Sequence, residues 1–281
     1  MKNYKHPNDR GYTNPELFVT TDWLEDNINK PNLQIVDVDS PEEYRLGHIP
    51  GASNPIDNFY KTSLDDRTHI QAPEIFSETM AKLGIDNSTQ VICYDRSAGL
   101  YSFRLIWALY YHGHKNVKFL DGGYPKWIDE NREVTKNQTL IQNKIFRTKI
   151  DKNIFADKDF LQKSFDNKSI IILDVRSDDE RNGVNLRGGS RGGRIPGSVH
   201  IEWKNFHTTG NIPILKSAKE IRKILYENNV TRDKNIITYC QGGIRAAHTF
   251  WALKLAGFNN VKNYDGSWRE WAEDFSCPIE N

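Results

Sequence analysis

The sequence repeats itself once, and the two copies are separated by 137 to 146 residues. The matching segments are 35–38 with 172–175, 48–52 with 194–198, and 116–123 with 260–267. A single repeat at so long a spacing is typical of tandem domains, because solenoid repeats run roughly 20–50 residues. A chain of 281 residues is also long enough for two domains. We therefore predict a first domain over 18–136, a linker over 137–156 and a second domain over 157–281.

Each copy alternates short apolar runs with amphipathic stretches. This alternation predicts an α/β fold with a mostly parallel sheet flanked by helices in each domain. The predicted helices are Ser97–His112, ending at Gly113, and Ile244–Leu255, ending at Gly257. The predicted strands are Gln34–Val38, Val91–Tyr94 and Val117–Leu120 in the first copy, and Ile170–Val175, Ile236–Tyr239 and Val261–Tyr264 in the second.

The two copies differ at the end of one predicted strand. In the second copy, Tyr239 is followed by Cys240, two glycines and Arg245, whereas Tyr94 in the first copy is followed by Asp95. A thiolate can act as a nucleophile in this position, and the carboxylate that replaces it cannot form the same covalent intermediate. The difference indicates a duplicated domain with one active site, in the second copy, and a catalytically silent first copy.

The loop from Cys240 to Arg245 has the residues expected of an anion site. It joins a strand to a helix, the place where α/β folds usually bind ligands. Gly242 and Gly243 allow the backbone N–H groups to turn inward, and the helix N-terminus adds positive potential. Arg245 adds a permanent cation. Such surroundings stabilise a thiolate and predict a reactive cysteine.

The alternative is that Cys240 is a small buried side chain at the end of a strand. The two glycines and Arg245 favour the catalytic interpretation. Cys93 lies inside a predicted strand without a glycine loop, and Cys277 follows two tryptophans near the C-terminus. We assign both of these cysteines to structure.

From 18 to 277, the chain resembles the tandem-domain rhodaneses, the thiosulfate and mercaptopyruvate sulfurtransferases. The motifs that carry this resemblance are 240–245, 194–198 and 265–268 in the second copy, and 47–51 and 121–123 in the first. In this family the N-terminal domain is silent and the C-terminal domain carries a cysteine that forms a persulfide. The resemblance implies that Cys240 takes the outer sulfur of thiosulfate, releases sulfite, and passes the sulfur to cyanide or a thiol. It implies no organic cofactor, and the sequence has no Cys/His cluster with metal-ligand spacing.

The resemblance also implies a set of substrate-binding residues. These are Gln241, Gly242, Gly243, Ile244 and Arg245 in the loop, with Arg194 from the basic segment 187–194. Arg191 is a weaker candidate for the same task, and a solvated surface segment is the alternative for both arginines. For five further residues a functional and a structural role are both open. Trp203 and Trp268 could line the pocket or belong to the core. Asp178 and Glu180 could brace the arginines or be surface charges, and His248 could act as a base or be a packed helix residue.

Other functions remain open at this point. Phosphatases with a related loop place five residues between the cysteine and the arginine, whereas this chain has four, and it has no evident acid for a leaving group. Family members that prefer 3-mercaptopyruvate typically carry Cys-Gly-Ser-Gly-Val-Thr, so Gln241 and Arg245 favour thiosulfate. The loop also departs from the animal thiosulfate enzymes, which have Arg and Lys after the cysteine. A sulfur carrier or binding protein without turnover is a further alternative.

The charge balance indicates no particular macromolecular partner. Lys and Arg number 38 against 37 Asp and Glu, so nothing points to nucleic acid or an anionic membrane. No apolar run has membrane-spanning length, and Met1–Pro7 is unlike a signal peptide. Three cysteines suit a reducing compartment better than a disulfide framework. We expect a cytoplasmic monomer that binds a small-molecule sulfur donor and acceptor.

Overall fold

The computed structural model describes residues 4–55 and 69–281, and these residues form two parallel five-stranded sheets. The strand order is β1-β5-β4-β2-β3 in the first sheet and β6-β10-β9-β7-β8 in the second, which is the same order twice. The prediction of two tandem α/β domains is confirmed. The strands are β1 (Phe18–Val19), β2 (Leu33–Asp37), β3 (Ala52–Ser53), β4 (Gln90–Tyr94), β5 (Val117–Leu120), β6 (Phe155–Ala156), β7 (Ile170–Asp174), β8 (Val199–His200), β9 (Asn235–Tyr239) and β10 (Val261–Tyr264).

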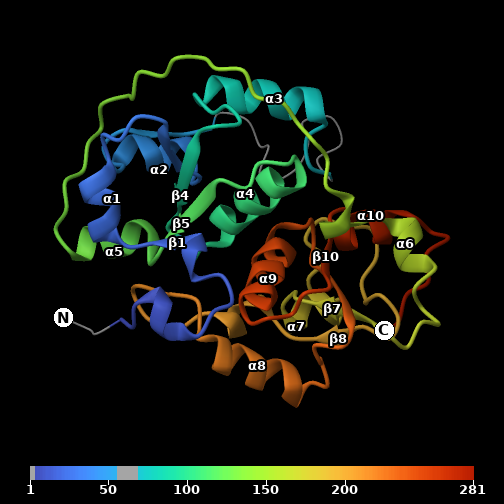
Figure 1. Ribbon diagram of the computed structural model, residues 1–281. Helices are drawn as coiled ribbons and strands as arrows, with labels where there is room; N and C mark the ends of the chain where they lie inside the picture. Colours follow the sequence, from blue (N-terminus) through green and yellow to red (C-terminus); the bar gives the residue numbers. More distant parts are fainter. Residues whose placement is uncertain (1–3, 56–68) are drawn as a thin grey trace.

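Helices flank both sheets (Figure 1). The α-helices are α1 (Thr21–Asn27), α2 (Pro41–Leu46), α3 (Pro73–Lys82), α4 (Leu100–Tyr111), α5 (Gly123–Asp129), α6 (Lys158–Gln162), α7 (Asp178–Arg181), α8 (Ala218–Glu227), α9 (Ile244–Leu255) and α10 (Ser267–Glu273). Short 3-10 helices occupy Pro7–Arg10, Pro15–Leu17, Lys152–Ile154 and Trp203–Phe206. The second predicted helix has the predicted bounds, whereas α4 begins at Leu100 and not at Ser97. Within the described ranges, no helix combines the length and the apolar character needed to cross a membrane.

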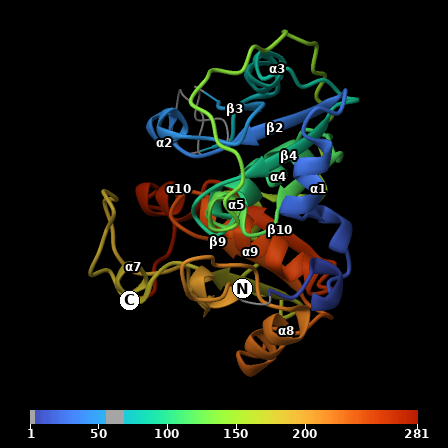
Figure 2. The same ribbon diagram turned by 90° about the vertical axis from the view of Figure 1, so that its left-hand side faces the viewer.

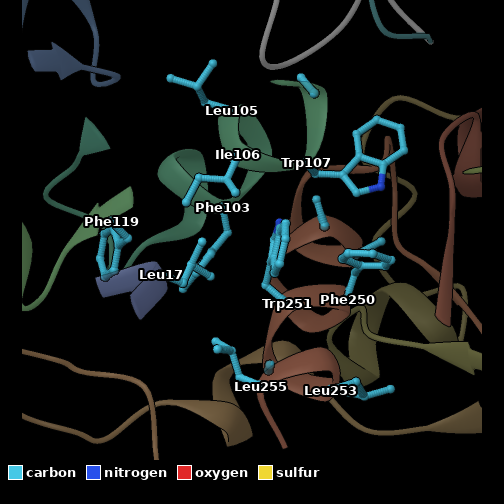
Figure 3. Close-up of a cluster of buried hydrophobic side chains, with 14 of the residues drawn as sticks. Leu17, Phe103, Leu105, Ile106, Trp107, Phe119, Phe250, Trp251, Leu253 and Leu255 are labelled. Carbon is cyan, nitrogen blue, oxygen red and sulfur yellow. The ribbon is translucent and has the colours of Figure 1, made fainter. Parts of the chain in front are cut away.

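The two domains share one hydrophobic core, in which α4 packs against α9 (Figures 1 and 2). Both helices are apolar on almost every side, because each covers its own sheet with one face and the other helix with the opposite face. Trp251 and Phe250 of α9 lie beside Trp107 and Phe103 of α4 (Figure 3), and one continuous buried cluster contains all four. Because both domains contribute side chains to this cluster, its burial stabilises each domain only while the other is packed against it.

The segment predicted as the linker runs along the outside of the first domain (Figure 1). Its backbone donates to this domain along its length, from Lys144 to Ala81, from Lys149 to His112 and from Asp151 to Tyr111, at 2.7–3.2 Å. The linker range 137–156 also includes β6, the edge strand of the second sheet. A strand of two residues is too short to show a periodic pattern, so the sequence could not predict it.

Candidate active site

Cys240 lies at the carboxyl end of β9, in the middle of the second sheet. β9 pairs with β10 on one side and β7 on the other, and the chain passes directly from Cys240 through three residues into α9. The cysteine is only 1% exposed. This position places the sulfur at the end of the sheet where α/β proteins bind ligands, in front of a helix N-terminus.

Ser267 binds the backbone of the loop through its hydroxyl group. Its Oγ accepts hydrogen bonds from the N–H groups of Cys240 and Gly243, at 3.1 and 3.0 Å, and donates to the carbonyl of Tyr264 at 2.8 Å. Two further bonds join the same segments, because the N–H groups of Trp268 and Arg269 donate to the carbonyls of Cys240 and Gln241. The start of α10 therefore fixes both ends of the loop.

The first copy shows what the equivalent loop binds. The carboxylate of Asp95 is buried and accepts hydrogen bonds from four backbone N–H groups, at 2.8–3.1 Å. The donors are Ser97, Gly99, Tyr101 and Ser102. This loop is an anion cradle that holds its own anion.

The loop of the first copy is also one residue longer than that of the second. Residues 95–99 separate Tyr94 from α4, whereas residues 240–243 separate Tyr239 from α9. The extra residue is accommodated with Ala98 in the left-handed region at φ 60°. The predicted start of the first helix at Ser97 would have made this loop the shorter one, so the difference is visible only when α4 is known to begin at Leu100.

In the second copy, the thiol of Cys240 stands where the first copy has a carboxylate. Across residues 4–55 and 69–281, no hydrogen-bond acceptor is found for the N–H groups of Gln241, Gly242, Ile244 and Arg245. A thiol places one sulfur atom in this cradle, while the Asp95 side chain places two oxygens. The second loop thus has donors for a negatively charged atom attached to Cys240.

Arg245 forms a two-bond ion pair with Glu180. Its Nη1 and Nη2 donate to Oε2 and Oε1 of Glu180, at 2.6 and 2.7 Å. Burial by itself would lower the pKa of Arg245, but its hydrogen bonds and ion pair with Glu180 raise the pKa above its usual value. Arg245 lies within electrostatic reach of Cys240, and the structure adds a carboxylate that neutralises the arginine.

Glu180 is ionised at any ordinary pH. It is almost fully buried, and burial alone would raise its pKa, yet the hydrogen bonds and charge of Arg245, with those from Ser177, lower it to about 2. Glu180 is also the third residue of α7, where it completes a capping box with Ser177. This local motif places the carboxylate in front of Arg245, so the prediction that Glu180 braces an arginine agrees with the geometry.

The arginines of the basic segment separate into two groups. Arg194 pairs with Glu280 at 2.6 Å, and Arg191 donates to four carbonyls at the end of α10 and beyond, so these two hold the C-terminal segment in place. Arg187 was not a candidate in the sequence analysis. Its side chain is 54% exposed, and its Nε lies 3.7 Å from Oε1 of Glu180. Its charge reaches Tyr101 of the first domain, where it opposes the rise in pKa that burial causes. Arg187 is therefore a half-exposed cation beside the pair of Arg245 and Glu180.

The other loop residues have different roles. Gln241 is buried, and its Nε2 has no partner among the described residues. Around Gly242 the space is open, since a Cβ there would meet nothing within 4 Å. Gly243 has φ 76°, and a Cβ at this position would lie 2.8 Å from the carbonyl oxygen of Asp265. Ile244 begins α9. The loop thus has no room for a side chain at Gly243 and free space at Gly242, and the side-chain amide of Gln241 lies next to it without a partner among the described residues.

The remaining candidates lie in the core or at the surface. Trp268 is buried behind the loop with the guanidinium of Arg176 over its ring, and Trp203 packs on His248. Burial lowers the pKa of His248 to about 3, and its Nε2 faces the carbonyl of Ala98, so it is a neutral packed side chain. Asp178 is exposed and pairs with His200.

Cys93 and Cys277 are buried, and burial raises the pKa of both thiols, which suits the structural role assigned to them. In the described part of the chain, no three residues of the types His, Cys, Asp and Glu come close enough to hold a metal ion.

Comparison with known proteins identifies the family of both domains. The model of the rhodanese-like domain matches residues 20–130 and again residues 157–274. The chain belongs to the rhodanese-like family. Each match contains one of the two loops, Asp95 in the first and Cys240 in the second.

Several relatives of the family match almost the whole chain. The sulfur carrier protein TtuD of Thermus thermophilus is 33% identical, with 96% of this chain and 98% of the relative covered. The thiosulfate sulfurtransferase of Corynebacterium glutamicum is 31% identical, with 96% and 92% covered. The anaerobic ergothioneine biosynthesis enzyme of Chlorobium limicola has a TM-score of 0.86 at 22% identity, over 96% of this chain and 71% of that one. This last likeness shows the fold.

The two glycines of the loop should respond differently to alanine. Gly243→Ala should lower the free energy of unfolding by more than about 1 kcal/mol, because its φ is positive and its Cβ would press on Asp265. Gly242→Ala should be neutral or slightly stabilising, since its Cβ enters open space. Urea unfolding of both variants measures this, and equal stabilities would contradict the geometry of the loop.

The Glu180–Arg245 pair should contribute measurably to stability. Glu180→Gln should lower the free energy of unfolding at pH 7 by about 1.5–3 kcal/mol, the scale of hydrogen bonds to charged groups. The matched control is Glu43→Gln, because Glu43 completes the equivalent capping box with Ser40 in α2 and is exposed. Glutamine preserves a capping box, so the control should stay within about 0.5 kcal/mol of the wild type.

The same pair predicts a pH dependence with a defined sign. The pKa of Glu180 is about 2 in the folded protein, below the value of about 4.3 expected when unfolded. Its contribution is therefore complete above pH 5 and is lost as the pH falls toward 2. The difference in unfolding free energy between wild type and Glu180→Gln should shrink over this range. A constant difference from pH 7 to pH 3 would mean that the ion pair is not its source.

Proposed function

We propose that this protein is a sulfurtransferase that carries sulfur as a persulfide on Cys240. The Cys240 thiolate attacks the outer sulfur of thiosulfate, the S–S bond of the donor breaks, and sulfite leaves with the electron pair. The outer sulfur of the Cys240 persulfide is then attacked by a thiophilic acceptor, cyanide or a thiol, and the Cys240 thiolate is released. This is a two-step covalent scheme.

The observation that carries the proposal is the carboxylate of Asp95. In the silent copy, this carboxylate fills the cradle with a negative charge bonded to four N–H groups. In the second copy the same type of loop surrounds a thiol, with N–H groups that still lack acceptors in the described structure. A persulfide extends the side chain by one sulfur atom and moves the negative charge toward these donors. The cradle thus suits the persulfide of Cys240 better than its thiol.

Thiosulfate is the proposed donor on account of the charge at the site. Arg245 and Arg187 share the single carboxylate of Glu180, so the three side chains together keep a positive charge that would attract an anionic donor. 3-Mercaptopyruvate is the alternative donor. A sulfur carrier without turnover is the second candidate function, favoured by the 33% identity to TtuD over nearly the full length.

Intact mass after brief exposure to each donor tests the chemistry. Wild type treated with thiosulfate should gain the mass of one sulfur atom, and Cys240→Ser should gain none, because the persulfide forms on that cysteine alone. A parallel exposure to 3-mercaptopyruvate ranks the two donors. The loaded protein should return to its original mass when cyanide is added.

Each departure from this result has a separate meaning. A gain of mass that cyanide or thiols cannot reverse would favour the carrier without turnover. Faster loading from 3-mercaptopyruvate would change the donor and leave the persulfide in place. If neither donor adds mass to the wild type, the proposed sulfurtransferase function is wrong.

Kinetics of two arginine variants test which cation attracts the donor. Arg187→Ala should lower kcat/KM for thiosulfate roughly fivefold, about 1 kcal/mol, as expected for a partly exposed charge. The loss should shrink at high salt, where exposed charges are screened. Arg194→Ala should mainly lower stability, because the side chain pairs with Glu280. A larger kinetic loss in Arg194→Ala would favour the sequence-based prediction for that residue.

A further inference from the structure

Asp265 is bound by the first domain, although it belongs to the second. It follows β10 at the carboxyl end of the second sheet, and its side chain is fully buried. Nη2 of Arg104, which is on α4, donates to its Oδ1 at 2.6 Å, and the N–H of Ile70 donates to its Oδ2 at 2.7 Å. Both carboxylate oxygens are therefore bonded to groups of the silent copy.

The same arginine reaches the loop that carries Cys240. Nη1 of Arg104 donates to the carbonyl oxygen of Gly243 at 3.4 Å, and Nδ2 of Asn263 donates to the same oxygen at 3.2 Å. The contact is close, since a Cβ on Gly243 would lie 3.0 Å from Nη1 of Arg104. The guanidinium thus touches the loop and the aspartate beside it at once.

The direction of this carbonyl also decides where one N–H group of the cradle points. The peptide between Gly243 and Ile244 is planar and trans, so its N–H points opposite to its carbonyl. The carbonyl oxygen accepts the first hydrogen bond of α9, from the N–H of Ala247 at 3.0 Å, and Asn263 and Arg104 add two bonds to it. The N–H of Gly243 is held by Ser267. The N–H of Ile244 is thereby directed to the inner side, where Cys240 lies.

The first domain contains a counterpart that has no catalytic loop to hold. Asp121 occupies the position equivalent to Asp265, and Arg10 of the N-terminal 3-10 helix binds it with two bonds of 2.7 and 2.5 Å. Both side chains are buried, as in the other pair. The two pairs therefore match in residue type and burial and differ in what lies next to them.

We propose that Arg104 is a positioning residue of the active site, and that the silent domain contributes to catalysis through it. By holding Asp265 and adding a bond to the carbonyl of Gly243, Arg104 supports α9 and Asn263 in keeping the cradle N–H groups directed at the sulfur of Cys240. This proposal rests on the assignment of Cys240 as the nucleophile, and it gives the first domain a role without a nucleophile of its own.

The test compares two charge-balanced double variants. Arg104→Met with Asp265→Asn removes the pair beside the loop, and Arg10→Met with Asp121→Asn removes its counterpart. The readout is the ultraviolet absorbance of the Cys240 thiolate against pH, taken as the difference from the same protein carrying Cys240→Ser. The midpoint of this titration should move up by about one pH unit in the first double variant, because an N–H donor to the thiolate is lost. The control should keep the wild-type midpoint, and both should show a lower Tm.

A second variant protects the test against misfolding. Arg104→Lys retains a cation for Asp265 but cannot also bond the carbonyl of Gly243 in the same way. It should give a smaller shift of the midpoint and a lower kcat for thiosulfate, with little change in KM, since donor attraction by Arg187 is unaffected. The proposal is wrong if the midpoint stays at the wild-type value in both Arg104 variants, or if the Arg10 control shifts equally.

The titration needs no sulfur donor, so it separates this proposal from the proposed function. A shifted midpoint in a protein that never gains sulfur would leave the positioning role standing and overturn the sulfurtransferase assignment. Sulfur gain with an unshifted midpoint would do the reverse.

Discussion

The packing of α4 on α9 is the constraint on which the rest of the molecule depends. Each helix begins directly after one of the two loops, so their contact also places the loops near each other at one end of the interface. His248 of α9 faces the carbonyl of Ala98 in the first loop, which shows how close this approach is. Because the helices are apolar on the sides that meet, neither domain can expose its helix to water without losing a large part of its buried apolar surface. The shared core therefore explains why a copy without a nucleophile is retained as a whole domain.

The charged side chains near Cys240 compensate each other more closely than the sequence alone indicates. Arg245 and Glu180 cancel each other's charge in a buried pair, and such a pair is more a device for fixing geometry than a source of net attraction. The attraction for an anion then comes from backbone N–H groups and from the half-exposed Arg187. On the proposed mechanism, N–H groups held in the loop would need no reorganisation when charge moves from the thiolate to a persulfide. The backbone would then stabilise the anion, and the half-exposed Arg187 would attract the donor.

Several features could be predicted from the sequence because their signals are local. The apolar runs that became β5 and β10 and the glycine that ends α9 act within a few residues, and so do the glycines after Cys240. The edge strands β1, β3, β6 and β8 have two residues each, too few for any period. The partner of Arg194 could not be predicted, since Glu280 is 86 residues away. Glu180 could be named as a brace, but not the arginine that it binds, because Arg245 is 65 residues away and the choice among the arginines depends on the route of the chain. The bond from Arg104 to Asp265 crosses between domains and spans 161 residues.

The two copies differ in one last position, which contacts the loop in each of them. Gly123 and Ser267 are equivalent, and both have a left-handed backbone, at φ 57° and 53°. In the first copy a Cβ at 123 would lie 2.3 Å from the carbonyl oxygen of Asp95, so only glycine fits. In the second copy a serine occupies the equivalent position, although a side chain in this conformation costs about 1 kcal/mol or more. Its hydroxyl offsets that cost by accepting the N–H groups of Cys240 and Gly243. The backbone strain is thus kept only in the copy that carries the cysteine, where the hydroxyl holds the cradle in shape.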